Sequence, residues 1–297
     1  MTARATAWGG PLAARLAGNR LHLAHGPIDL VIRADGPSAS VERAYRAASA
    51  AFDGLLESLV AVLPRLRSPV GSADGLPPAA RLMQAATAPL AVDRFVTPMA
   101  AVAGAVADTV MAAIRAVPGI ERAYVNNRGD IAVHLTPSAS IEIGVVPELR
   151  RPLMAASLRL RHDDGIGGVA TSGWDGRSFS LGIADAVTVL AANAASADVA
   201  ATLIANAVDL PGHPAIRRRP ARELAPDSDL GDRPVVVDVA PLDPTDRDAA
   251  LQAGLAVAET MRARGLIRGA FLHLQGASRA TAPAALPASN RPEGDMP

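Results

Sequence analysis

The chain has 297 residues, enough for a sizeable hydrophobic core in one large domain or two smaller lobes. Its 29 basic residues balance 29 acidic ones, so no net field attracts nucleic acid or an anionic membrane, and we expect neither as a partner. The absence of cysteine excludes disulfides, thiolate metal sites and cysteine nucleophiles. Without a secretory leader pattern or an uninterrupted apolar span, the sequence predicts a cytoplasmic protein.

The first half of the chain combines a hairpin with helices. Alternating apolar residues around a Gly-Pro turn predict a hairpin over 20–34. Apolar residues at helical spacing predict a helix over 38–66, and a shorter one over 80–88 follows a Pro/Gly-rich loop. A Thr-Pro start predicts a further helix over 98–117, which we expect to be buried because it is apolar apart from Asp108.

The second half alternates strands and helices without a regular βαβ repeat. Five glycines within 165–176 predict a loop. The other expected elements are strands over 122–126, 131–135 and 141–145, a strand over 186–191, a helix over 195–207, an excursion over 210–233, a strand over 235–239, a helix over 243–264 and a strand over 267–274. This order predicts an α+β fold with mixed or antiparallel sheets and packed helices, either as one body or as two lobes around a cleft. We expect a single domain over 1–275 and a disordered tail over 276–297, which is rich in Ala, Pro and Ser.

Two helices carry candidate acidic residues. Gly104 and Asp108 are one turn apart on an otherwise apolar helix, and a buried carboxylate needs a partner, which is either a cation, a nucleotide group or only an arginine. Asp198 and Thr202 are spaced i, i+4 near a helix start, so they share a face. Two hard oxygens in this arrangement suit Mg²⁺, although an aspartate in a first turn is also ordinary helix chemistry.

Two loops carry candidate nucleotide-binding residues. The first is a hairpin tip made of Asn127, Arg128, Gly129 and Asp130, which an ordinary turn with positive φ also explains. The second contains Thr171 and Ser172 beside glycines, and its backbone amides and hydroxyls suit a phosphate.

Taken in order, these segments resemble the ApbE-type FAD:protein FMN transferases. That family has a helix reading A-x-A-K-G-Y-A-V-D, then V-N-x-G-G-D, T-S-G, an alternating strand and A-D-x-x-x-T. The corresponding stretches here, all between Pro98 and Asn206, are AVAGAVAD at 101–108, VNNRGDI at 125–131, ATSG at 170–173, VTV at 187–189 and ADVAAT at 197–202. The likeness is greatest to an uncharacterised branch of cytoplasmic ApbE relatives that shares the Gly-Asp-Ile-Ala stretch.

The resemblance implies an ApbE-like fold and a flavin-nucleotide cleft for FAD or FMN, with an acceptor protein as a further partner. It implies Mg²⁺ bound by Asp198, Thr202 and a backbone carbonyl near Val102, and catalytic roles for Asp108 and Asp198. The residues that it implies for flavin binding are Gly104, Asn127, Arg128, Gly129, Asp130, Thr171 and Ser172. We therefore predict that Asp108, Asp130, Thr171 and Asp198 converge in one cleft.

The chain also departs from the family pattern. The family's lysine is Ala103, its first hairpin glycine is Arg128, and its His-x-x-D-P-x-T-G hairpin has no counterpart. One interpretation is that the charge of Arg128 replaces that of the lysine. Three functions remain open: an Mg²⁺-dependent enzyme that transfers FMN or cleaves FAD, a non-catalytic flavin- or nucleotide-binding protein, and a catabolic enzyme that accepts a small organic substrate in the same cleft.

Overall fold

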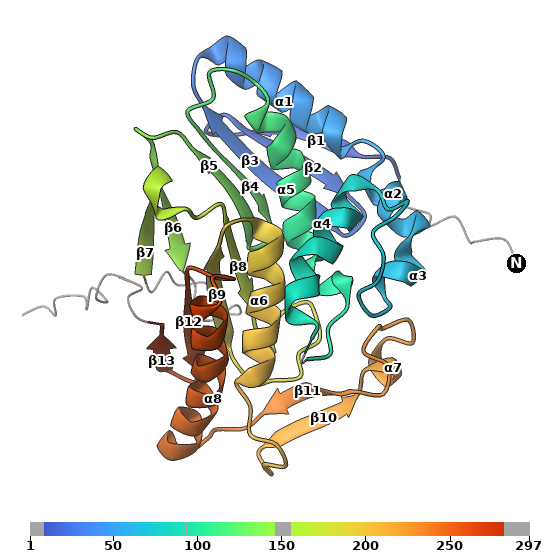
Figure 1. Ribbon diagram of the computed structural model, residues 1–297, viewed down its shortest axis with the longest axis vertical. Helices are drawn as coiled ribbons and strands as arrows, with labels where there is room; N and C mark the ends of the chain where they lie inside the picture. The colour runs from blue at the N-terminus through green and yellow to red at the C-terminus, as the bar shows by residue number, and fades with distance from the viewer. Residues whose placement is uncertain (1–8, 93, 146–155, 282–297) are drawn as a thin grey trace, which may run out of the picture.

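One large antiparallel sheet organises the protein (Figure 1). The computed structural model describes residues 9–92, 94–145 and 156–281. The sheet has nine strands in the order β1-β2-β3-β4-β5-β8-β9-β12-β13, and its recorded strand pairs are antiparallel. These strands are β1 (Leu12–Leu16), β2 (Arg20–His25), β3 (Ile28–Asp35), β4 (Arg122–Asn127), β5 (Asp130–Leu135), β8 (Gly168–Ser172), β9 (Ala186–Ala191), β12 (Gly269–Leu274) and β13 (Ala277–Ala280). The predicted α+β class with antiparallel sheets is confirmed.

The main helices cover one face of this sheet, where α5 and α6 lie side by side (Figure 1). The helices are α1 (Ser38–Phe52), α2 (Leu55–Ala61), α3 (Leu63–Leu66), α4 (Pro78–Thr87), α5 (Val102–Arg115), α6 (Ala194–Ala207), α7 (Ala221–Leu224) and α8 (Pro244–Ala263), with 3-10 turns η1 (Ala88–Leu90), η2 (Pro98–Ala101) and η3 (His162–Asp164). By length and composition the stretch Pro98–Arg115 would be able to cross a membrane. In the fold α5 contacts α1, α4, α6, β4 and β5, so the prediction of a buried helix is confirmed.

The predicted hairpin over 20–34 is confirmed as β2 and β3, but the predicted helix over 38–66 is wrong in its continuity. Three helices occupy that stretch. Gly54 adopts φ +69°, a left-handed conformation that interrupts a right-handed helix after Phe52. The apolar stripe continues across the break because all three helices bury residues against the same core, which is why the periodicity alone missed it.

Glycines concealed a strand in the segment 165–176, where the prediction of a loop or a set of tight turns is wrong for 168–172. An added Cβ at Gly168 would lie 2.1 Å from the carbonyl carbon of Asn193, and one at Gly167 would lie 2.4 Å from the oxygen of Ala192. Glycine therefore permits β8 to pass directly beneath the start of α6. The excursion over 210–233 likewise contains β10 (Ile216–Pro220), which pairs with β11 (Pro234–Val239) in a separate two-stranded sheet. A third sheet, of β6 (Ser140–Val145) and β7 (Ala156–Arg161), includes a strand that the sequence reading missed.

The first residues of the predicted tail, 276–281, belong to the fold, so the prediction of disorder is wrong for them. Residues 277–280 form β13, which pairs with β12. The next residue, Thr281, is buried, and its hydroxyl accepts a hydrogen bond from the Ala270 amide at 3.0 Å. The rest of the predicted tail, 282–297, lies outside the described residues.

Alternation along the strands divides the side chains between two cores. Even-numbered residues of β3 and β5, such as Leu30 and Ala132, pack under the helices in the main core. Odd-numbered residues of β5 face the opposite side, which we call the outer face. There Val133 and Leu135 join Ile143 of β6 in a smaller core. A side chain's place in the sequence thus decides which of the two faces it reaches.

The two halves of the sheet meet at a short seam. Only two residue pairs, Ile131 with Val169 and Ala132 with Gly168, are recorded between β5 and β8. No pair is recorded at the end where β5 begins with Asp130 and β8 continues to Thr171. The candidate residues of the sequence analysis lie around this seam, together with the starts of α5 and α6.

Candidate functional site

Two aspartates cap each other's helices at the seam. Asp198 of α6 accepts a hydrogen bond from the backbone amide of Gly104, in the first turn of α5, at 3.0 Å. Asp108 of α5 accepts from the amides of Ala194 and Ala195, in the first turn of α6, at 3.1 and 2.8 Å. Each carboxylate thereby satisfies amides that have no partner inside their own helix and lies at a positive helix end. The two helices run antiparallel and are joined by this exchange.

Gly104 permits the helices to approach closely enough for the exchange. An added Cβ at this position would lie 2.2 Å from the carbonyl oxygen of Ala194, and backbone atoms cannot yield as a flexible side chain would. The glycine that resembles the family's motif therefore has a packing role, because it brings Asp198 within reach of the α5 amides.

Burial raises the pKa of all three carboxyls at the seam. Desolvation raises the pKa of Asp198 to about 7; the amides of Gly104 and Ala103 oppose the rise, and the charge of Asp108 adds to it. Desolvation raises that of Asp108 to about 6, against the lowering effect of its two amide donors. Asp130, at the start of β5, has a pKa well above its usual range because of desolvation and, secondarily, the nearby charge of Asp198. Ionising the three groups together is therefore unfavourable in the protein alone.

Asp130 and Asp198 have no basic partner in the part of the chain that the structure describes. Within the described part of the chain no arginine forms an ion pair with either carboxylate. The chain contains no lysine, so arginine is the only permanently charged side chain that was available. Two buried carboxylates that approach each other without a counter-charge are unfavourable unless a proton or a cation is bound.

Thr202 adds an uncommitted hydroxyl one turn further along α6. Other helical threonines donate to the carbonyl four residues earlier: Thr109 to Ala105 at 2.7 Å, and Thr87 to Met83 at 2.8 Å. No hydrogen bond of this kind is recorded for Thr202 among the described residues. Its half-buried side chain shares a helix face with Asp198, as the i, i+4 spacing predicted.

Two of the predicted ligand-binding side chains, those of Asn127 and Arg128, are paired with residues other than the three carboxylates. Asn127 is only 5% exposed, and its amide group donates to the Ala103 carbonyl at 3.1 Å, which ties the hairpin to the start of α5. The Arg128 guanidinium lies 3.0 Å from the Asp29 carboxylate. The interpretation that Arg128 supplies the lysine's charge at the seam is therefore wrong. Residue 128 is in the turn, with φ +58°, and its recorded side-chain partner is Asp29.

Thr171 does not join the carboxylates either. Its hydroxyl is 2.9 Å from that of Thr188, which stands opposite it on β9. Because Val187 and Val189 pack in the main core, Thr188 and Thr171 face the outer side of the sheet. The next residue is Ser172. Ala170, two residues earlier on the same strand, is in the main core, so the Ser172 side chain is on the helix side of the sheet. Of the four residues predicted to converge, Asp108, Asp130 and Asp198 come together and the Thr171 side chain does not.

The hairpin tip has the geometry that the sequence predicted. Arg128 and Gly129 have φ +58° and +114°, as a tight two-residue turn requires, and the Gly129 amide donates to the Asn126 side chain at 2.8 Å. The turn places Asp130 at the first position of β5, on the helix side. Gly129 therefore acts by shaping the turn that delivers Asp130 to the seam.

The donor set at the seam suits a hard cation only in part. No group of three or more His, Asp or Glu side chains with metal-binding geometry occurs in the ranges that the structure describes. A cation site here would thus combine one or two carboxylates with a hydroxyl, backbone carbonyls and ligand oxygens, which is the usual surrounding of Mg²⁺ bound with a phosphate.

Sequence reasoning also missed residues on the outer face. Asp29 pairs with both Arg128 and His22, whose Nε2 lies 2.8 Å from the carboxylate. A pocket around Tyr124 is also on this face and lies away from the three carboxylates. Strand alternation was the available signal. It sends the odd-numbered residues of β3 and the even-numbered residues of β4 to the outer face.

The family of the chain follows from a match over most of its length. A family model described as "AbpE bacteria" matches residues 13–280. The chain therefore belongs to the ApbE-like family, as the motif order indicated.

The chain is also similar to several proteins of known sequence or structure. A UPF0280 protein of Methanopyrus kandleri is 39% identical over 183 residues, which cover 60% of this chain and 69% of that protein. Another, from Methanothrix thermoacetophila, is 40% identical over 115 residues, or 38% of this chain and 46% of the relative. The apo flavinyl transferase ApbE of Pseudomonas stutzeri aligns over 92% of this chain and 94% of its own, with 16% identity and a TM-score of 0.46. The ApbE protein of Thermotoga maritima aligns over 92% of this chain and 96% of its own, with 12% identity and a TM-score of 0.46.

Proposed function

We propose that the site at the seam, between β5, β8 and the starts of α5 and α6, binds a flavin nucleotide, FAD or FMN, together with a divalent cation such as Mg²⁺. The observation that carries the proposal is the pair Asp130 and Asp198, two partly buried carboxylates whose pKa values are raised and which have no basic partner among the described residues. A bound cation would allow both to ionise near neutral pH. The flavin part rests on the ordered motif resemblance and on membership of the ApbE-like family.

The residues that would hold the cation are Asp198, Thr202 and a backbone carbonyl near Val102, with Asp130 facing them from the hairpin. Mg²⁺ would supply the positive charge that neutralises a nucleotide diphosphate. The first-turn amides of α6 are already occupied, by Asp108 and by the side chain of Asn193, and cannot cradle a phosphate.

The same site supports two versions of this function. In the first, the protein transfers FMN to a Thr or Ser of an acceptor protein, or cleaves FAD. In the second, it binds the nucleotide without reaction. The second is favoured by two observations: Ala103 occupies the position of the family's lysine, and the Arg128 guanidinium is paired with Asp29 away from the seam. A cytoplasmic location remains a prediction.

Calorimetric titration of FAD tests the binding site. Wild type is expected to bind FAD in Mg²⁺ and much more weakly in EDTA. Asp198→Asn keeps an oxygen for the Gly104 amide but loses the charge, so we expect weak binding that no longer depends on Mg²⁺. The exposed Asp163→Asn serves as the matched control and should titrate like wild type. Identical titrations of wild type and Asp198→Asn would remove Asp198 from the site.

The release of AMP separates the two versions. Transfer of FMN to a protein and hydrolysis of FAD both break the diphosphate and leave AMP, whereas binding alone does not. Prolonged incubation with FAD and Mg²⁺, followed by chromatography of the nucleotides, is expected to show retained FAD and no AMP. AMP formation by wild type that disappears in Asp198→Asn would establish the catalytic version instead.

A further inference from the structure

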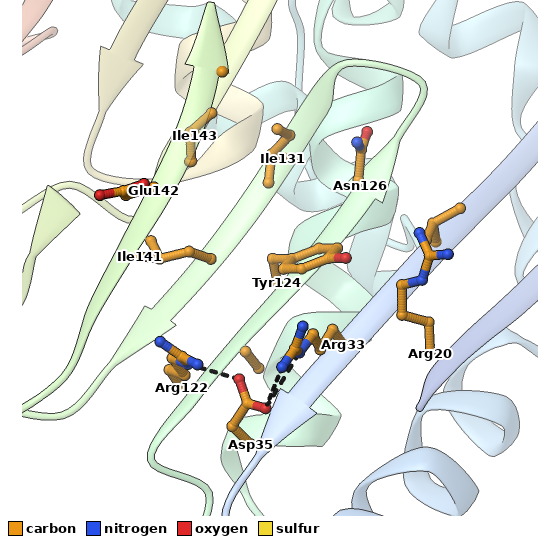
Figure 2. A pocket seen from close by; sticks show the side chains of 13 residues that line it. Arg20, Arg33, Asp35, Arg122, Tyr124, Asn126, Ile131, Ile141, Glu142 and Ile143 are labelled. Atoms are coloured by element: carbon orange, nitrogen blue, oxygen red, sulfur yellow. Dashed lines mark hydrogen bonds and ion pairs between the residues drawn. The ribbon is translucent and has the colours of Figure 1, made fainter. Parts of the chain in front are cut away.

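A pocket lies on the outer face of the sheet (Figure 2), opposite the carboxylates. It has a volume of about 530 Å³, within the usual range for small-molecule sites. Its walls are the outer face of β3, β4 and β5 and the facing strand β6, and Figure 2 shows Tyr124 between Arg33 and Asn126 in its interior. Neighbouring residues on one strand separate the two sites: Asn127 contacts α5, whereas Asn126 lines this pocket.

The pocket has an aromatic and aliphatic floor with a free polar end. Besides Tyr124, its apolar lining consists of Val31 of β3, Ile131 of β5, and Ile141 and Ile143 of β6. Within the described residues no hydrogen bond is recorded for the Tyr124 hydroxyl. The other tyrosine of the chain, Tyr45, is buried, donates to the Asn19 carbonyl at 2.6 Å and accepts from the Ala34 amide at 3.2 Å. Tyr124 thus presents an apolar ring and an available hydroxyl to the pocket.

Two arginines, Arg33 and then Arg20, follow Tyr124 in one row across the sheet and line the pocket. Arg33 is directly opposite Tyr124, and Arg20 extends the row because Leu21 pairs with Ile32. Like charges on directly opposite residues are unfavourable unless an anion lies between or above them. The arrangement therefore places two positive groups next to an aromatic surface.

The acidic residues of the pocket do not cancel this charge. Asp35 is shared by two guanidinium groups, 3.2 Å from Arg33 and 2.6 Å from Arg122. Glu142, on the rim, is paired with Arg159 at 2.9 Å. The Arg20 guanidinium has the Ala17 carbonyl as its recorded partner, and no carboxylate in the described ranges forms an ion pair with it.

We propose that this outer pocket binds a small organic anion with a flat apolar body. The body packs on the Tyr124 ring between Ile131 and Ile141, and the anionic group, either a carboxylate or a phosphate, accepts hydrogen bonds from Arg20 and Arg33. Charge-assisted hydrogen bonds from guanidinium groups suit both kinds of anion. This site is independent of the proposed flavin site, because it lies on the other face of the sheet.

Fluorescence titration with naphthalene probes tests the proposal. The two anionic probes are 2-naphthoate and 1-naphthyl phosphate, and neutral 2-naphthalenemethanol has the body without the charge. Wild type is expected to bind at least one anionic probe saturably at millimolar concentrations or below, and more tightly than the neutral probe. The tighter of the two anionic probes distinguishes carboxylate from phosphate.

Substitutions locate the binding. Arg20→Gln should raise the Kd of the preferred anionic probe about tenfold and leave the neutral probe unchanged. Tyr124→Leu should weaken all three probes. Arg217→Gln, which changes an exposed arginine on the remote β10, is the matched control and should behave like wild type. Asp198→Asn should also leave the probes unaffected, so a failure of the flavin proposal would not be mistaken for a failure of this one.

Two results would overturn the assignment. One is the absence of saturable binding of both anionic probes to wild type. The other is an equal Kd for wild type and Arg20→Gln when circular dichroism shows that the variant is folded.

Discussion

The substitution Asp198→Asn should stabilise the metal-free protein above neutral pH. An aspartate has an ordinary pKa of 3.8, and in this fold that of Asp198 is about 7. The folded state therefore retains the proton longer than the unfolded chain. Between these two values the folded state binds more protons, so the free energy of unfolding falls as pH rises. The free energy of unfolding is fully reduced at pH values above the folded-state pKa, and it is not reduced at all below the pKa of the unfolded chain.

The size of the effect follows from the same two values. Their difference corresponds to roughly 4 kcal/mol, an upper bound because the Asp198 side chain keeps some contact with solvent. Asparagine has nearly the same shape, cannot ionise and still accepts a hydrogen bond from the Gly104 amide. At about pH 8 the variant should exceed wild type by roughly 2–4 kcal/mol, and at about pH 4 the two should be nearly equal.

Urea unfolding followed by circular dichroism, in EDTA across this pH range, measures the effect. Asp163→Asn is the control and should follow the wild-type pH dependence. Adding Mg²⁺ at high pH should stabilise wild type and not Asp198→Asn, because a ligand that binds only the folded state stabilises it. Parallel pH profiles for wild type and Asp198→Asn in EDTA would refute the reasoning, since burial would then impose no penalty on the charge.

Three further predictions concern packing, two of them at the seam and one at the edge of the sheet. Gly104→Ala should destabilise the protein by about 1–3 kcal/mol or more, because its Cβ meets the Ala194 backbone; calorimetric melting measures this, and an unchanged Tm would contradict the close approach. Asp108→Ala should lower the free energy of unfolding by about 1–2 kcal/mol through loss of two α6 amide caps, and Asp108→Asn should recover part of it in urea unfolding. A chain that lacks everything from Ala277 should melt at lower temperature than one ending at Thr281, since β13 is lost; equal melting would show that this strand contributes nothing.

Local patterns in the sequence were enough to predict much of the framework. The alternation over 20–34 and the Asn127–Asp130 tip predicted two hairpins, because turn geometry depends on residues close in sequence. The apolar run with a single Asp108 predicted a buried helix, since a helix without a polar face must be covered. The order of the motifs indicated the family, which the match over 13–280 shows.

Tertiary structure decided which of the motif residues meet. Thr171 and Ser172 are adjacent in the sequence, yet the strand in which they lie sends them to opposite faces, and that strand was hidden by glycines. Those glycines and Gly104 leave room for backbone at the start of α6, which lies about 25 residues after Gly168 and about 90 residues after Gly104. No local pattern in the sequence encodes such a contact.

The exchange of caps between α5 and α6 is likewise a product of packing. Asp108 and Asp198 each look like an ordinary helical aspartate in the sequence, and only the antiparallel crossing of the two helices turns them into reciprocal partners. The same crossing removes both from water and brings Asp198 near Asp130, which raises all three pKa values. The sequence by itself determined which residues carry charge and which element each belongs to. Whether those charges have partners depended on long-range contacts, because burial and distance between residues far apart in the chain arise only when the elements pack.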